Sequence, residues 1–119
     1  MNKEDLKKRT KEYALRIIKL IKALPNTVEG RAIGNQLIRS GTSVGANYRA
    51  VCRARSRAEF ISKLGVVIEE ADESAFWLEI IIEIGMIKRE TIEPLLQETN
   101  EIVAIMVSSR KSSIKNQKS

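Results

Sequence analysis

The stretch that decides the fold is EFISKLGVVIEEADESAFWLEIIIEIG, residues 59–85. Apolar residues recur in it at alternating spacings of four and three, which is the heptad-like pattern of a helix that packs along a seam. The seam consists of Phe60, Leu64, Val67, Ala71, Ser74, Leu78 and Ile81. A second apolar line runs beside it through Ile61, Ile68, Ala75 and Ile82. The pattern predicts a helix over about residues 57–85 that other helices must cover.

Three further amphipathic helices are predicted around it, over about residues 3–24, 28–54 and 90–110. The second passes through SGTSVGAN, residues 40–47, where each glycine costs roughly 1 kcal/mol of helix propensity against alanine. We expect a continuous helix there, in which small residues let a neighbour approach closely. Short joints favour an all-α, antiparallel up-down-up-down four-helix bundle over residues 1–110, followed by a polar basic tail at 111–119.

Composition excludes several kinds of active site. The 119 residues contain no histidine and one cysteine, Cys52, so His/Cys metal clusters, histidine-based catalytic sets and an internal disulfide are ruled out. The polar first residues do not resemble a signal peptide. The most apolar run, residues 74–87, is too short to cross a bilayer. We expect a cytoplasmic protein that is not an enzyme, with no cofactor, no metal, no small-molecule substrate and no membrane association.

Charge is distributed unevenly along the chain. Residues 1–57 hold 14 Lys or Arg against 4 Asp or Glu, a net of +10, whereas residues 58–107 hold 3 against 11, a net of −8. The last 12 residues add +4, which returns the overall +6. This asymmetry indicates a polyanionic partner, association between unlike faces, or both.

The segment QLIRSGTSVGANYRA, residues 36–50, resembles the central signature of the bacterial four-helix-bundle proteins found in intervening sequences of 23S ribosomal RNA genes (the S23 family). Residues 59–87 and Leu24-Pro25 are similar to the same family. The resemblance implies a bundle that assembles as a ring, typically a homopentamer. A relative, the accessory variability determinant of diversity-generating retroelements, shares the architecture and binds nucleic acid. This chain departs from the usual pattern at Gly45, where proline is common, and at residues 48–50.

The candidate nucleic-acid contacts are basic residues of the second helix, of the turn after it and of the C-terminal region. They are Arg31, Arg49, Arg53, Arg55, Arg57, Arg110 and Lys111. Guanidinium groups match phosphate geometry. The alternative is a solvated helix face whose arginines pair with acidic residues of the same chain. We favour this alternative for Arg39, which lies on the same face of the predicted second helix. Aromatic residues for base stacking are absent apart from Tyr48, so we expect backbone contacts without sequence reading.

Three other groups of residues have structural interpretations. A polar interhelical network is expected from Gln36, Arg39, Ser40, Ser43, Asn47 and Glu70, with Asp72 as a second carboxylate. No base is present to make a nucleophile of its serines. A solvated or subunit-facing acidic stripe is expected from Glu69, Asp72, Glu73, Glu79 and Glu83. A subunit interface is expected from Phe76, Trp77, Ile80 and Ile84, because an apolar patch beyond the core marks a partner.

Two functions compete. The leading hypothesis is a homo-oligomeric binding module that holds RNA or DNA electrostatically. The alternative is a structural or protein-interaction scaffold, in which the basic half of one subunit pairs with the acidic half of its neighbour and no nucleic acid binds.

Overall fold

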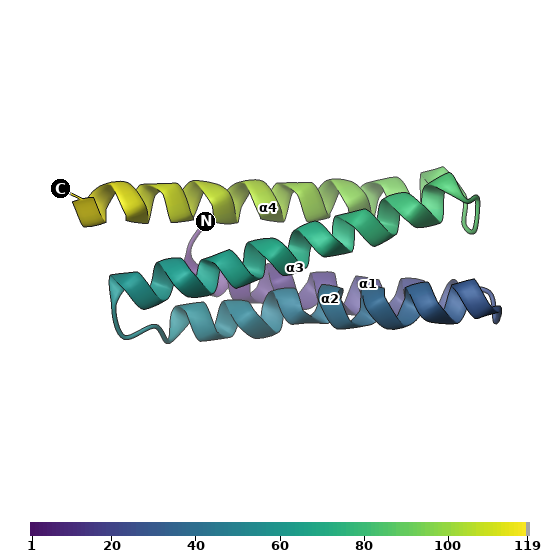
Figure 1. Cartoon of the computed structure of the whole chain (residues 1–119), viewed down its shortest axis with the longest axis horizontal. Coiled ribbons are helices and arrows are strands. Elements are labelled where there is room, and N and C mark those ends of the chain that lie inside the picture. Colours follow the sequence, from purple (N-terminus) through teal and green to yellow (C-terminus); the bar gives the residue numbers. More distant parts are fainter. Residues whose placement is uncertain (119) are drawn as a thin grey trace.

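The computed structural model describes residues 1–118 and contains four helices, α1 (Lys3–Ala23), α2 (Val28–Cys52), α3 (Arg57–Glu83) and α4 (Arg89–Lys118). They run up, down, up and down as a rod of 51 × 22 × 20 Å (Figure 1). Consecutive helices pack side by side, and α1 packs less closely against α4 to close the bundle. The all-α four-helix bundle predicted from the heptad pattern is confirmed.

Local signals fix where the first three helices begin and the third ends. The side chains of Asn2, Thr27 and Ser56 accept hydrogen bonds from backbone amides in the first turns of α1, α2 and α3. Each cap satisfies a donor that has no partner within its helix. Gly85 follows α3 with a φ of 68°, a left-handed conformation that favours glycine. The chain can therefore reverse into α4 over a short joint.

The fourth helix differs from the prediction at both ends. It begins at Arg89, one residue before the predicted start, and Pro94 lies in its second turn. It also continues to Lys118, so the predicted helix end near residue 110 was eight residues too early, while Ser119 lies outside the described residues. The extension has a surface to pack on, because Arg110 Nε donates to the Ile61 carbonyl oxygen at 3.1 Å and Ile114 is half-buried.

The helix α2 is continuous through residues 40–47, as expected, and its glycines lie against α1. A Cβ atom on Gly41 would lie 2.8 Å from Cγ1 of Ile17, which is fully buried. A Cβ atom on Gly45 would lie 3.1 Å from the Thr10 carbonyl oxygen. The absence of side chains at these two positions is what lets α1 and α2 approach so closely.

A layer of buried hydroxyl groups crosses the apolar core, with one member from each helix. The Tyr13 hydroxyl on α1 lies 2.6 Å from Thr99 Oγ1 on α4, and Ser74 Oγ on α3 donates to Ser40 Oγ on α2 at 2.9 Å. Ser40, Ser74 and Thr99 are fully buried and Tyr13 nearly so. Burial raises the pKa of Tyr13 to about 12, so its hydroxyl stays protonated at neutral pH. Buried polar groups that must find their partners favour one helix register over others.

Two glycine substitutions test the close approach of α1 and α2. Gly41→Ala is expected to destabilise the protein by roughly 1–3 kcal/mol, because the added methyl overlaps a β-branched side chain that cannot move aside. Gly65→Ala, whose Cβ meets only Arg110 Nε at 3.7 Å, is expected to stabilise it by about 1 kcal/mol through helix propensity. Urea unfolding followed by circular dichroism measures both, and equal shifts of the same sign would contradict the packing argument.

Candidate nucleic-acid interface

A basic groove lies between α1 and α2. Its walls are formed by Lys7 and Lys11 from α1 and by Arg49 and Arg53 from α2, and its volume is about 390 Å³. Its floor consists of small residues, namely Ala14, Thr42, Gly45 and Ala46. The close approach of the two helices at Gly45 therefore brings two rows of cations together.

These groove cations are available to a ligand. Lys11, Arg49 and Arg53 are exposed and form no ion pair with any residue that the structure describes. Lys7 lies 3.2 Å from Glu4, which is one turn away and 81% exposed. An exposed ion pair of that kind contributes little and is easily exchanged for another anion.

Further cations surround the groove at the same end of the rod, where α1 and α3 begin and α2 and α4 end (Figure 1). Arg55 shares a neighbouring depression with Arg53 and Lys63. Arg57 and Lys3 line another depression near the end of α4, and Lys111 is exposed on α4 itself. Antiparallel packing thus gathers at one end the basic residues that the sequence divides between its first half and its tail.

Two of the predicted nucleic-acid contacts lie elsewhere. Arg31 is near the opposite end of α2, where it donates to Asn26 Oδ1 at 2.8 Å. Arg110 is half-buried and donates to the Ile61 carbonyl, so its guanidinium takes part in the packing of α4 on α3. The structure places Arg49, Arg53, Arg55, Arg57 and Lys111 together at the basic end and separates these two from them.

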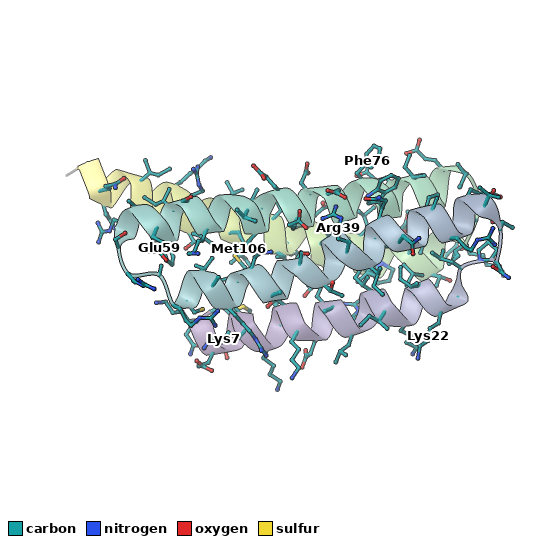
Figure 2. All side chains as sticks on the ribbon, turned by 60° about the horizontal axis from the view of Figure 1, so that its bottom comes forward. Lys7, Lys22, Arg39, Glu59, Phe76 and Met106 are labelled. Atoms are coloured by element: carbon teal, nitrogen blue, oxygen red, sulfur yellow. The ribbon has the colours of Figure 1, made fainter. Side chains whose placement is uncertain are left out.

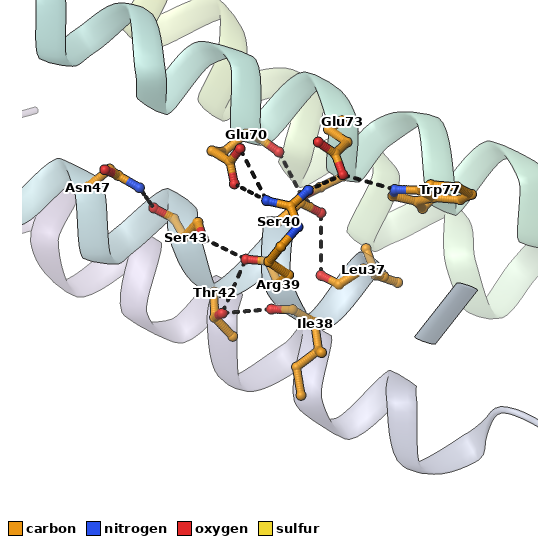
Figure 3. Close-up of polar contacts among 11 residues, drawn as sticks. Leu37, Ile38, Arg39, Ser40, Thr42, Ser43, Asn47, Glu70, Glu73 and Trp77 are labelled. Carbon is orange, nitrogen blue, oxygen red and sulfur yellow. Dashed lines mark hydrogen bonds and ion pairs between the residues drawn. The ribbon is translucent and has the colours of Figure 1, made fainter. Parts of the chain in front are cut away.

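Arg39 of α2 is held by two carboxylates of α3 (Figure 3). Its guanidinium donates from Nη1 to Glu70 Oε2 at 3.0 Å and from Nη2 to Glu73 Oε2. Trp77 Nε1 also donates to Glu73 Oε2, at 3.2 Å. The hydrogen bond from Arg39, and secondarily that from Trp77, holds the pKa of Glu73 below its usual range. The second carboxylate is therefore Glu73 and not Asp72, which is exposed, so the choice of Asp72 was wrong.

The other members of the predicted polar network have separate partners (Figure 3). Ser40 bonds Ser74 across the helix interface. Ser43 Oγ donates to the Arg39 carbonyl, and Asn47 Nδ2 donates to the Ser43 carbonyl, so both bond their own helix. The Gln36 side chain is exposed and makes no hydrogen bond to any described residue. Contact between α2 and α3 through this group therefore rests on Arg39 and Ser40.

The apolar patch on α3 is on the surface. Phe76 is 52% exposed and Ile84 is 53% exposed, while Trp77 and Ile80 are half-buried. The Phe76 and Trp77 rings meet edge to face with centroids 5.0 Å apart.

Of the acidic stripe, only Glu73 is paired with a basic side chain of the described chain. Phe76 and Lys7 lie on opposite sides and towards opposite ends of the rod (Figure 2).

The described residues offer few other kinds of site. Over residues 1–118, no group of three or more Cys, Asp or Glu side chains is arranged to hold a metal ion. None of the four helices combines the length and the apolar character that crossing a membrane requires. The basic groove is accordingly the surface with the most distinctive chemistry.

Sequence reasoning missed Lys7 and Lys11. Their spacing of four residues places them on one face of α1, as the same spacing does for Arg49 and Arg53 on α2. Both pairs of basic residues, four positions apart, can be recognised in the sequence. Which face of α1 turns towards α2 was not, because it depends on the contact between Thr10 and Gly45.

Comparison with known proteins relates the chain to one family. The profile of the 23S rRNA-intervening sequence protein matches residues 2–108. A crystal structure from Bacteroides thetaiotaomicron VPI-5482, described as a protein with unknown function from the S23 ribosomal protein family, is 39% identical with a TM-score of 0.86. The similarity covers 93% of this chain and 99% of that one. No curated protein matches the chain.

The lowered pKa of Glu73 makes a pH-dependent prediction. Its ionised form is favoured in the folded state, so it contributes stability above its ordinary pKa that is lost as pH falls through the lowered pKa. Glu73→Gln should therefore lower the urea midpoint modestly at pH 7 and by less at about pH 3, because the contribution of the carboxylate declines once the pH falls below the ordinary carboxyl pKa. Glu69→Gln, an exposed position without an ion pair in the described chain, is the matched control. Identical behaviour of both variants at both pH values would contradict the role of Arg39.

Proposed function

The chain belongs to the family of 23S rRNA-intervening sequence proteins, and from this premise we propose that it is a non-enzymatic, homo-oligomeric cytoplasmic protein that binds nucleic acid electrostatically. The observation that supports binding most directly is the α1–α2 groove with its four cations. Lys11, Arg49 and Arg53 lack acidic partners in the described chain and Lys7 has only the exposed Glu4, so these side chains can replace the counterions of a phosphate backbone.

The distribution of paired and unpaired arginines also supports this surface. Arg9 and Arg39 each contact two carboxylates across a helix interface, and both therefore have structural partners. Arg49 and Arg53 have none within the described chain and remain exposed. Exposed arginines without partners do little for the stability of the bundle, so a ligand gives them a physical role.

The homo-oligomer is proposed from the patch of Phe76, Trp77, Ile80 and Ile84. An edge-to-face aromatic pair with one exposed and one half-buried ring is a typical anchor of a protein interface. Phe76 of the patch and Lys7 of the groove lie on opposite sides of the rod (Figure 2), so a subunit that covers Phe76 can leave Lys7 open. The resemblance to the S23 family makes a ring, and a pentamer in particular, the assembly that we expect.

A charge-neutralising pair of substitutions tests nucleic-acid binding. Arg49→Gln with Arg53→Gln should weaken the binding of fluorescent RNA and DNA oligonucleotides, measured by anisotropy from 50 to 200 mM salt. The slope of log K against log salt should become shallower by about 1.4 on single strands, because two phosphate contacts are lost. Lys19→Gln with Lys22→Gln removes the same charge from exposed positions at the other end of α1 and should leave the slope unchanged.

Two results would contradict this proposal. The first is the absence of any anisotropy change with wild-type protein at 50 mM salt. The second is an equal loss in both pairs of variants, which would show that net charge and not the groove determines affinity. If the Arg49 and Arg53 pair instead reduced the native mass, the groove would be a subunit contact, as in the scaffold alternative.

The apolar patch yields a separate prediction about assembly. Phe76→Ser with Ile84→Ser should lower the native mass measured by sedimentation, while circular dichroism stays helical because both side chains are more than half exposed. Leu15→Ser is the control, since Leu15 is 58% exposed on α1 and outside the patch. An unchanged mass in the double variant, or dissociation caused by Leu15→Ser alone, would place the interface elsewhere.

A further inference from the structure

We infer that the end depression, the cavity lined by Lys3, Arg57 and Phe60 at the basic end of the rod, binds one unpaired nucleotide. The base lies against the Phe60 ring, and its phosphate contacts the two cations. This inference rests on the proposed function and adds a base contact to an interface that is otherwise electrostatic. The shared chemistry is an aromatic base joined to a phosphate, either within a strand or as a free nucleotide.

The end depression combines an apolar wall with positive charge. It lies where α1 and α3 begin, beside the last turns of α4 (Figure 1). Its volume is about 410 Å³, within the range of about 300–1,000 Å³ for small-molecule pockets. Val51, Ala54 and Phe60 form the apolar wall. Lys3 and Arg57 are exposed and form no ion pair with any described residue. This wall beside two unpaired cations fits an aromatic group that carries an anion.

Phe60 belongs to the apolar seam of α3, and it is also the aromatic residue that this end of the rod offers to a base. It is half-buried, packs against the core and lines the depression. Tyr13 and Tyr48 are buried, and the remaining aromatic residues belong to the patch near the other end of α3. Lys3 Nζ lies 6.0 Å from the Phe60 ring centroid. That distance is at the outer limit of a cation–π contact, so the ammonium group can turn to a phosphate at little cost.

The lysines of α1 connect the end depression to the groove. Lys3 lines the depression, and Lys7 and Lys11 line the groove. The three residues are four positions apart, which places them on one face of α1 at intervals of about 6 Å along the helix. A strand whose phosphates follow this row reaches the depression, where it can turn one base towards Phe60. A base within a duplex must first leave its stack, so the nucleotide that enters is an unpaired one.

Two strands that differ only in their bases test this inference. The full-length protein is titrated with dT12 and with an abasic strand of the same length, by anisotropy across 50–200 mM salt. Stacking on one face of a half-buried ring should make dT12 bind roughly tenfold tighter at every salt concentration, towards the lower end of the range for base–aromatic contacts. The salt slopes of the two strands should be equal, because phosphate contacts determine them.

Substitutions separate the base contact from the phosphate contact. Phe60→Leu should abolish the difference between the two strands without changing the slope, while Phe60→Tyr, which keeps the ring, should retain the difference. Arg57→Gln should instead make the slope shallower by about 0.7 for both strands, because one phosphate contact is lost. Phe76→Leu removes an aromatic ring towards the other end of the rod and is the matched control, which should bind both strands like the wild type.

Equal binding of dT12 and the abasic strand by the wild-type protein would overturn the inference, and so would a difference that persists in Phe60→Leu. Both results would leave the proposed function standing, whereas failure of both strands to bind would refute it. Competition with dTMP distinguishes the two sources of the nucleotide. Displacement of dT12 by micromolar dTMP, lost in Phe60→Leu, identifies a free nucleotide, and resistance to dTMP together with the expected difference identifies the nucleotide of a strand.

Discussion

The contact of α1 with the glycine face of α2 is the constraint on which the rest of the molecule depends. Gly41 admits Ile17 and Gly45 admits the backbone of Thr10, so the two helices are both close and fixed in register. The same contact forms the groove floor and sets Lys7 opposite Arg49. A larger residue at either glycine would alter the core and the surface together. Packing inside the bundle and chemistry outside it are therefore two results of one close approach.

A second constraint holds α3 against α2 and divides the arginines into two groups. Ser40 and Ser74 bond within the core, and Arg39 reaches Glu70 and Glu73 just outside it. Arg39 gains acidic partners because it faces α3. Arg49 and Arg53 lie further along the same helix and have no ion pair in the described chain. The presence of carboxylate partners on α3 therefore distinguishes the structural Arg39 from the two arginines that are open to a ligand.

Periodicity predicted the four helices and the seam of α3, because burial follows directly from spacing along a single helix. Relations between helices were harder to predict. Glu73, not Asp72, pairs with Arg39, and neighbouring residues differ by about 100° in direction. Lys11 joins the groove only because α1 is turned so that Thr10 meets Gly45. The polar composition of residues 111–118 concealed that α4 has a packing surface there. In each case the missing information was the orientation of one helix relative to another.

The basic end of the rod also has an electrical consequence. The peptide dipoles of antiparallel neighbours oppose one another, so the positive field at this end arises from side chains alone. At physiological ionic strength that field decays over about 8 Å, which is far shorter than the 51 Å rod. The acidic residues near the other end are therefore screened from a polyanion approaching Arg53. The two ends are electrically independent, and each can change its charge in evolution without altering what the other attracts.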